Sequence, residues 1–583
     1  MSVVGTAGHV DHGKSTLLVA LTGRDPDRWE EEKRRGLTID LGFVWATLPS
    51  GRQVSFVDVP GHERYIKNML AGIEAIDVAL LVVAADEGWM PQSEEHLAVL
   101  DLLGVERGVV ALTKVDRVDS DLVELATLEV MEHLEGTSLA GAPIMPVSAP
   151  AGQGVDEVAA ALDAALTETE PGGDPRLWVD RRFTVAGAGT VVTGTLLGGP
   201  LAVGDTLEAY PGGEMLRIRS IESHEESHDR IDPHRRVALN LVGDSEAIER
   251  GTMLGRPGVW KATDRFTAHI RPARYVDELG EKGAYQVHAG SAAVPARLRL
   301  VEQGALLTLD RPLPLRYGDR FILRETGRRA VVGGGRILDP RPPARGRALR
   351  AAASLPSGLT PVDAADALLE LRAMDTRSNL RAETGAEPET AISHGDILLT
   401  RIRLEDLTER ATALIDEFHS THPLRPGLPL ATLASRLGVE AEVASMVVED
   451  APDLGGDGTV AWRAGWEVEL GPGQQRAWEE ARSLLAAAGL QAPRAAELPI
   501  DRELIHGLVR AGGLVMISED LIYLPEEAEK LRSAVAAMPE GFTVADFRDR
   551  LGISRKYAVP ILEWADDQGL TRRRGDTRSP VRD

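Results

Sequence analysis

The stretch that decides the fold is Gly8-His9-Val10-Asp11-His12-Gly13-Lys14-Ser15. It fits the pattern of a glycine, four residues and then Gly-Lys-Ser/Thr, whose backbone N–H groups surround phosphate oxygens. The apolar run at 2–7 predicts a buried strand before this loop, and 17–21 predicts a helix after it. A glycine-rich turn that precedes Lys-Ser by chance would lack these flanks, so the sequence predicts an α/β nucleotide-binding domain.

Each part of this loop has an expected task. Lys14 is expected to reach the outer phosphates, and the Ser15 hydroxyl is expected to ligate Mg²⁺. The backbone of the loop and the first turn of the helix are expected to surround the phosphates. The full set of expected phosphate contacts is Gly8, His9, Val10, Asp11, His12, Gly13, Lys14, Ser15 and Thr16.

Composition limits the class of protein. The 583 residues suggest several domains. No run of about 18 apolar residues occurs, so we expect no membrane span, and because the phosphate loop begins at Gly8 we also expect no signal peptide. The chain has no cysteine, which fits a reducing compartment, and we expect it in the cytoplasm. Its net charge of −25 means that any RNA contact must come from a local basic patch.

Two further segments carry groups that a nucleotide-hydrolysing enzyme needs. Thr38 follows a charged stretch and can offer Mg²⁺ a second hydroxyl, although a solvated charge run would look the same. The apolar run 54–57 predicts a strand that ends at Asp58, which can hold Mg²⁺ through water. Gly61 can approach the γ-phosphate with its N–H, and His62 then stands where a residue orients the attacking water.

The base-binding residues are expected at the ends of two later strands. The run 109–113 predicts a strand that delivers Lys114 and Asp116 to the carboxyl edge of the sheet, where open α/β sheets bind ligands. A carboxylate at Asp116 can accept from the guanine N1–H and N2–H₂ groups, a donor pair that adenine lacks. The backbone at Ser148 and Ala149 can contact guanine O6. The predicted ligand is therefore GTP.

Together these motifs resemble the translational GTPases of the elongation factor Tu type. The resemblance implies that Lys14, Thr38 and His62 are catalytic, and that hydrolysis to GDP and phosphate stays slow until the ribosome positions His62. Val10 and Leu37 resemble the apolar pair that screens this histidine, with ordinary packing as the alternative. Thr113 stands where most of the superfamily has Asn, which is expected to weaken one polar contact to the base and loop.

Beyond a Pro- and Gly-rich linker near 171–175 the pattern changes to short β-branched segments separated by Gly-rich turns. This predicts two small antiparallel β-barrels, at 174–260 and 261–345, after a GTPase domain at 1–173. The order again resembles elongation factor Tu, in which the barrels clamp an aminoacyl-tRNA against the GTPase domain.

Two segments, 179–190 and 234–240, narrow the resemblance to the selenocysteine-specific elongation factors. It implies that Asp180, Arg181 and Arg236 line the aminoacyl pocket. A selenol is an anion near neutral pH, so two guanidinium groups would favour it over the neutral serine hydroxyl. Successive strand residues point to opposite faces, so Asp180 and Arg181 can share a pocket only near a strand end or bulge. Arg182 or Arg235 could be the partner instead, or all could be rim charges.

The last third is mostly helical and contains a repeat. Arg436-Leu437-Gly438-Val439 recurs as Arg550-Leu551-Gly552-Ile553, each after a short helix pattern and before an amphipathic helix and a turn-containing strand pair. The spacing predicts winged-helix modules at 346–403, 404–467, 468–526 and 527–583.

The final module is locally basic, unlike the rest of the chain. Its first helical turn and its expected wing carry residues suited to phosphates and to base stacking: Arg555, Lys556, Tyr557, Arg572, Arg573 and Arg574. The selenocysteine factors bind an mRNA hairpin with their last winged helix, and the resemblance implies the same for these residues. A solubilising basic tail is the alternative.

We therefore predict a multidomain monomer: a P-loop GTPase domain, two β-barrels and a mainly α tandem of winged helices. The resemblance implies that GTP and Mg²⁺ serve it, that selenocysteinyl-tRNA, an mRNA hairpin and the ribosome are its partners, and that it acts at UGA codons. A general aminoacyl- or initiator-tRNA-binding GTPase is the alternative. A non-catalytic nucleic-acid-binding adaptor is disfavoured by the Lys14, Thr38, Asp58 and His62 set.

Overall fold

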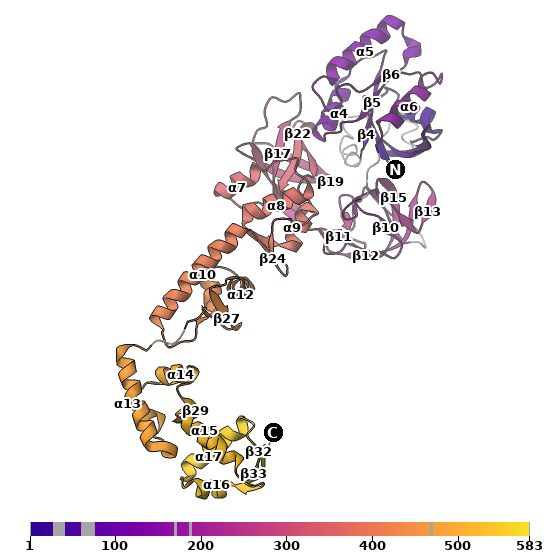
Figure 1. Cartoon of the computed structure of the whole chain (residues 1–583). Coiled ribbons are helices and arrows are strands. Elements are labelled where there is room, and N and C mark those ends of the chain that lie inside the picture. Colours follow the sequence, from indigo (N-terminus) through magenta and orange to yellow (C-terminus); the bar gives the residue numbers. More distant parts are fainter. Residues whose placement is uncertain are drawn as a thin grey trace. The chain divides into compact units, whose positions relative to one another are not determined.

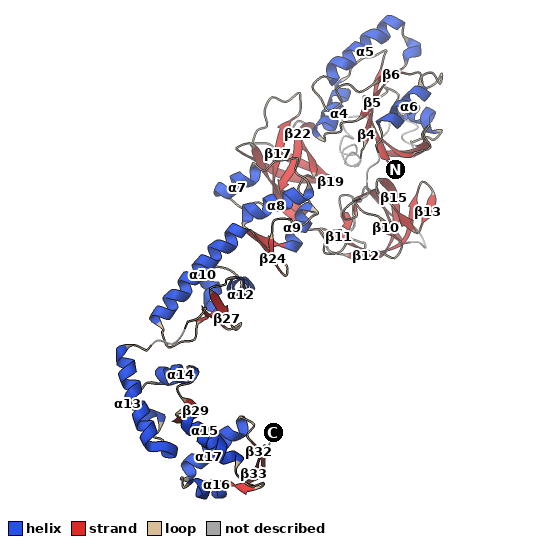
Figure 2. Cartoon of the chain, viewed as in Figure 1, coloured by secondary structure: helices blue, strands red, loops and turns tan. Residues whose placement is uncertain are grey.

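The computed structural model describes residues 2–26, 41–59, 76–167, 172–185, 189–466 and 470–581. The chain divides into two compact units, Met1–Thr400 and Arg401–Asp583 (Figure 1). None of the described helices is both long enough and apolar enough to cross a membrane. The expected order of a GTPase domain, two barrels and helical modules is confirmed, with strands concentrated in the first unit and helices in the second (Figure 2).

The first domain is a sheet with helices on both faces. Within its described residues the strand order is β2-β3-β1-β4-β5-β6, and all neighbours are parallel except β2 and β3. The strands are β1 (Ser2–Ala7), β2 (Gly42–Thr47), β3 (Gln53–Asp58), β4 (Val78–Ala84), β5 (Gly108–Thr113) and β6 (Ile144–Pro146). The helices are α1 (Lys14–Thr22), α4 (Pro91–Leu102), α5 (Ser120–Leu134) and α6 (Val155–Ala165), with the short helix η2 (Val115–Arg117) after β5.

The central strand β4 explains this layering. Its residues are all buried, as expected for a strand that is covered on both faces. Leu80 and Val82 pack into one core with α1 and α6, whereas Leu81 and Val83 pack into the other with α4 and α5. The loops after β1 and β5 and the residue Asp58 at the end of β3 lie at the carboxyl ends of parallel neighbours, and the described GTP residues that they carry therefore meet at one edge of the sheet.

Two antiparallel barrels follow. In the first, the path β11-β16-β7-β9-β15-β12 closes because β11 also pairs with β12, and β8 pairs with β9. The second is a closed barrel of order β17-β20-β19-β18-β21-β22. The first contains β7 (Arg176–Trp178), β8 (Arg181–Val185), β9 (Gly189–Leu197), β10 (Leu201–Ala202), β11 (Thr206–Tyr210), β12 (Met215–Ser223), β13 (Glu226–His228), β14 (Arg230–Ile231), β15 (Arg235–Gly243) and β16 (Met253–Gly255). The second contains β17 (Thr263–Pro272), β18 (Tyr285–Ala289), β19 (Ala292–Val301), β20 (Gly304–Leu313), β21 (Arg320–Glu325) and β22 (Ala330–Asp339). We call them barrel 2 and barrel 3.

The rest of the chain repeats one plan, helices followed by a small antiparallel sheet. The first copy has α7 (Gly346–Ala353), α8 (Pro361–Arg372), α9 (Arg377–Thr384), β23 (Met374–Thr376), β24 (Ile392–His394) and β25 (Ile397–Leu399). The next has α10 (Arg401–Thr421), α11 (Leu430–Leu437), α12 (Ala441–Asp450), β26 (Leu428–Pro429), β27 (Leu454–Gly456) and β28 (Val460–Arg463).

The two remaining copies share a hydrophobic core. One has α13 (Pro472–Ala488), η3 (Gly489–Gln491), η4 (Ala495–Glu497), α14 (Arg502–Arg510), β29 (Val515–Ser518) and β30 (Leu521–Tyr523). The other has α15 (Pro525–Ala536), α16 (Val544–Leu551), α17 (Arg555–Asp567), β31 (Phe542–Thr543), β32 (Thr571–Arg574) and β33 (Thr577–Pro580). The predicted boundaries 403/404 and 526/527 lie inside α10 and α15, and the two units divide before α10.

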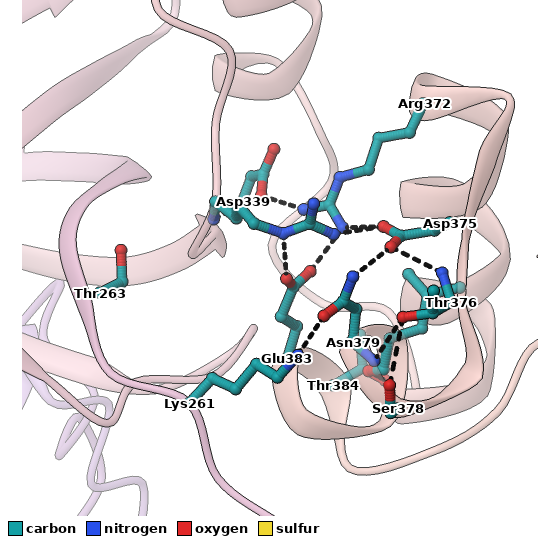
Figure 3. A network of polar contacts seen from close by, with 12 residues as sticks. Lys261, Thr263, Asp339, Arg372, Asp375, Thr376, Ser378, Asn379, Glu383 and Thr384 are labelled. Carbon is teal, nitrogen blue, oxygen red and sulfur yellow. Dashed lines mark hydrogen bonds and ion pairs between the residues drawn. The ribbon is translucent and has the colours of Figure 1, made fainter. Parts of the chain in front are cut away.

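The first helical copy is joined to barrel 3 by a network of buried charges (Figure 3). Arg372 reaches Asp339 at the end of β22 with an Nη2–Oδ1 distance of 2.6 Å, and Asp375 with an Nη1–Oδ2 distance of 2.7 Å. It also pairs with Glu383 of α9. Burial opposes the charge of Arg372, but the surrounding carboxylates outweigh burial and raise its pKa. The helices at 346–384 therefore belong to the same compact unit as the barrels.

Candidate functional site

The phosphate loop has the backbone that only its glycines allow. Gly8 has φ 129°, and a Cβ there would lie 2.1 Å from the carbonyl oxygen of Val82. Gly13 has φ 89° and precedes α1 directly. Asp11 adopts φ 61°, a left-handed conformation that Asp tolerates better than most residues. The loop thus bends so that the N-terminus of α1 faces the space where phosphates would bind.

Lys14 lies buried inside this loop. Its Nζ donates to the carbonyl oxygens of Gly8, at 3.0 Å, and His9, at 2.6 Å. Burial lowers the pKa of Lys14 to about 8, although the nearby Asp58 and Asp11 carboxylates oppose that shift. A phosphate anion would compensate this desolvated ammonium, so the residue fits the role predicted for it.

Two of the predicted Mg²⁺ ligands, Ser15 on α1 and Asp58 at the end of β3, are in contact. Ser15 Oγ donates to Asp58 Oδ2 at 2.9 Å, and Thr6 Oγ1 donates to Asp58 Oδ1 at 2.7 Å. Asp58 is fully buried at the end of β3. A hydroxyl and a carboxylate form a hard oxygen donor set, which is what Mg²⁺ takes from a protein. Thr38, Leu37, Gly61 and His62 lie outside the described residues, so their predicted roles stay predictions.

The predicted base-binding residues gather after β5 and β6. Asp116 lies beside Ser148, and the polar contact between their side chains lowers the pKa of the Asp116 carboxyl. Lys114 pairs with Glu87, at 2.7 Å between Nζ and Oε1, and with Asp86 at 3.3 Å. Burial opposes the charge of Lys114, yet these carboxylates raise its pKa. Ala149 follows Ser148 directly, in the turn after β6.

Thr113, which replaces the usual Asn, keeps a contact to the phosphate loop. Its buried hydroxyl donates to the carbonyl oxygen of His12 at 2.6 Å and lies 3.3 Å from that of Val83. Thr113 therefore makes a hydrogen bond between the strand that precedes the predicted base-binding residues and the loop. The sequence alone predicted only that one contact would weaken.

The three residues predicted for the aminoacyl pocket also meet. Arg236 forms a two-pronged ion pair with Asp180, with Nη2 lying 3.0 Å from Oδ1. Thr193 Oγ1 donates to the same carboxylate oxygen at 2.7 Å. Burial would raise the pKa of Asp180, but the Arg236 charge outweighs burial and holds that pKa below its usual value. Asp180 directly precedes β8 and Arg181 begins it, so both sit at the strand end that sharing a pocket requires.

Arg181 and Arg236 line a cavity of about 240 Å³ between barrel 2 and strand β2 of the GTPase domain. Arg182 and Arg235, the alternatives, are not among the described residues that line it. The Arg236 guanidinium carbon lies 3.3 Å from the centre of the Phe43 ring, and Arg181 Nη2 donates to the Leu41 carbonyl at 2.6 Å. Sequence reasoning missed Phe43, because nothing in its neighbourhood indicated that β2 packs against a barrel.

The predicted RNA-binding residues lie on the last helical copy. Arg555 and Lys556 are exposed in the first turn of α17, and Arg572, Arg573 and Arg574 are exposed along β32. Tyr557 is only half-exposed, since its hydroxyl donates to the Gln491 carbonyl at 3.3 Å. Ser554 occupies the N-cap position of α17 without a side-chain capping bond, and Pro560 lies inside that helix.

Comparison with known proteins agrees with this geometry. Three family models match: the elongation factor Tu GTP-binding domain at 1–168, the β-barrel domain of selenocysteine-specific elongation factors at 263–344, and a winged helix of elongation factor SelB at 534–579. The chain is 33% identical to the selenocysteine-specific elongation factor of Desulfomicrobium baculatum, over 99% of both chains. The chain belongs to the selenocysteine-specific elongation factor family.

Other members of this family match the chain over almost its whole length. The factor of Escherichia coli is 34% identical over 98% of both chains. A crystal structure of a bacterial selenocysteine-specific elongation factor covers all of this chain with a TM-score of 0.79 and 26% identity. By contrast, the translation initiation factor 2 subunit gamma of Thermococcus onnurineus is 40% identical but matches only 45% of this chain. Family membership makes the chain a GTP-binding elongation factor, and the general-factor alternative is not supported.

We expect Thr113→Val to weaken guanine-nucleotide binding by about tenfold, because the buried His12 carbonyl loses its donor while the side-chain volume is kept. Titration with a fluorescent GDP measures this affinity. Thr127→Val is the control, since that hydroxyl bonds within α5 at Val123. Equal affinity of the Thr113→Val variant and the unaltered chain would contradict the role given to this contact.

Proposed function

We propose that this chain carries selenocysteinyl-tRNA to the ribosome in a GTP-dependent way, at UGA codons marked by an mRNA hairpin. GTP hydrolysis to GDP and phosphate then releases the tRNA. The observation that carries this proposal is that the predicted GTP site and the predicted aminoacyl pocket lie in one compact unit. A phosphate loop with a buried lysine lies in the same unit as a cavity lined by two arginines.

Charged and hydroxyl side chains of this chain would bind the phosphates of GTP and the Mg²⁺. Lys14 would turn from the Gly8 and His9 carbonyls to the outer phosphates, and Ser15 and Asp58 would hold Mg²⁺ directly and through water. The bound Mg²⁺ would neutralise phosphate charge. Asp116 would select guanine, and the family resemblance assigns Thr38 to the metal and His62 to the attacking water.

The cavity between β2 and barrel 2 has the chemistry for an anionic side chain. Asp180 holds the Arg236 guanidinium at the pocket, and Phe43 gives that pocket an apolar wall. In such a partly dry site a selenolate gains charge-assisted hydrogen bonds that a neutral serine hydroxyl does not. This supports discrimination between selenocysteinyl-tRNA and the seryl form of the same tRNA.

The last helical copy would bind the mRNA hairpin. Its exposed arginines stand on a helix start and on a strand that belong to one small module. RNA loops offer phosphates to arginines and bases to aromatic rings. Because Tyr557 also contacts Gln491 of the neighbouring copy, we expect the arginines to dominate this binding.

We predict that His62→Ala leaves GTP affinity unchanged and abolishes ribosome-stimulated hydrolysis, because positioning of the water supplies most of the catalysis. Phosphate release is measured after adding ribosomes to the complex with GTP. His394→Ala, an exposed histidine on β24, is the control. Stimulated turnover at the normal rate in the His62 variant would refute the assignment.

Arg181→Met should lower the preference for selenocysteinyl-tRNA over seryl-tRNA by about tenfold, since one charged hydrogen-bond donor to the selenolate is lost. Arg181 is preferred to Arg236 for this test because removing Arg236 would leave Asp180 buried and unpaired. Competition binding with the two charged tRNAs gives the ratio. Arg182→Met, one residue along the same strand, should keep the full preference; a pocket formed by Arg182 would show the reverse pattern.

Arg572→Glu combined with Arg573→Glu should abolish mRNA hairpin binding and spare GTP hydrolysis, because two phosphate-binding charges are inverted. Electrophoretic mobility shift with the hairpin measures binding. The control is Arg476→Glu with Arg482→Glu on α13, which makes the same change in charge at exposed positions away from β32 and should leave hairpin binding unchanged. Hairpin affinity that survives the first pair, or falls equally with the second, would argue against a specific site on β32.

A further inference from the structure

Helix α4 touches the phosphate loop through two side chains. Gln92 Oε1 accepts a hydrogen bond from the backbone N–H of Val10 at 3.0 Å, and His96 Nδ1 accepts one from the N–H of Gly8 at 2.9 Å. These side chains are four residues apart, so they lie on one side of the helix. They come from a helix that is far from the loop in sequence and that the motif does not include.

His96 has the neutral ring that it needs to accept the hydrogen bond from Gly8. His96 is almost completely buried, and burial lowers its pKa to about 3, so the ring is neutral. Since Nδ1 accepts from Gly8, the ring proton belongs on Nε2. A buried N–H that loses its acceptor costs free energy, so both bonds hold the outer side of the loop in place. The opposite side, at Gly13 and the start of α1, is the side that faces phosphate.

The same helix is fastened to barrel 3. Asp101 Oδ2 lies 3.1 Å from Arg271 Nη1 of β17, and Arg271 also donates to the Asp101 carbonyl. Glu94 Oε1 lies 3.2 Å from Arg274 Nε, just after β17. Glu95 Oε1 accepts from the N–H of Val331 on β22 at 3.3 Å.

An apolar contact accompanies these polar ones. Leu97 and Leu100 of α4 belong to one buried cluster with Ala273, Ile322 and Val331 of the barrel 3 region. The core of the GTPase domain on this face therefore continues into the barrel. A helix packed in this way moves with the barrel or breaks several buried contacts.

Building on the GTP site proposed above, we propose that α4 transmits the docking of barrel 3 to the phosphate loop. Gln92 and His96 are positioning residues for the nucleotide, and Glu94, Glu95 and Asp101 set where α4 holds them. Whatever loads barrel 3, such as a tRNA held by the barrels, then changes nucleotide affinity without touching the nucleotide. The coupling is reciprocal, so nucleotide binding also strengthens the docking of barrel 3.

The first test removes the acceptors in the full chain. His96→Leu should weaken fluorescent GDP binding by about tenfold, whereas His96→Asn, which keeps an acceptor near the Nδ1 position, should retain most of the affinity. Gln92→Met, at a half-buried position that tolerates substitution better, should also weaken binding. Normal GDP affinity in both His96→Leu and Gln92→Met would overturn the positioning role.

The second test measures the coupling. Arg271→Gln with Arg274→Gln should change the rate of GDP dissociation by roughly threefold or more, although neither residue lies in the loop. Arg299→Gln, exposed on β19 of the same barrel, should release GDP at the unaltered rate. In a background that carries both Gln92→Met and His96→Leu, the Arg271 and Arg274 changes should have little further effect, because both links from α4 to the loop are already cut.

These outcomes separate the two proposals. If the unaltered chain fails to bind guanine nucleotide, the proposed function is wrong. If that chain binds GDP but the Arg271 and Arg274 changes leave dissociation unaltered, or act equally with and without the Gln92 and His96 side chains, the link through α4 is wrong while the proposed function stands.

Discussion

A buried ammonium group without a full counter-charge is the constraint on which this molecule depends. Lys14 is held by two backbone carbonyls, and burial lowers its pKa to about 8. Keeping such a charged group away from water costs free energy. The negative charge of a bound polyphosphate would offset that cost. The glycines with positive φ, the start of α1 and the Ser15–Asp58 contact all lie around this one charge.

The cavity lined by Arg181 and Arg236 is formed by strand β2 of the GTPase domain as well as by barrel 2. Leu41 and Phe43, which touch Arg181 and Arg236, directly follow the segment that contains Thr38. The wall of the cavity that we propose for the aminoacyl group is therefore continuous in sequence with a residue expected to bind the metal. Together with α4, which ties the phosphate loop to barrel 3, this gives each barrel its own contact with the nucleotide-binding domain. A carrier whose cargo is released by hydrolysis needs connections of this kind.

Much of this could be predicted from the sequence, because the signals are local. The phosphate loop, the strand that ends at Asp58 and the repeats that end in Gly438 and Gly552 depend on backbone conformations that few residues adopt. Both repeat glycines do cap helices in the left-handed conformation. The residues of the tertiary contacts were not predictable in this way. Phe43, Gln92 and His96 look like ordinary strand and helix residues until the fold brings them to an arginine or a loop N–H.

The most direct test measures how tightly the purified chain holds selenocysteinyl-tRNA with each nucleotide. A charged tRNA with a fluorescent label is titrated with the chain loaded with GDP, or with a GTP analogue that is not hydrolysed. If the third phosphate controls the cargo, the triphosphate form should bind the charged tRNA far more tightly than the diphosphate form. Equal affinity in the two states would contradict a carrier that releases its tRNA on hydrolysis.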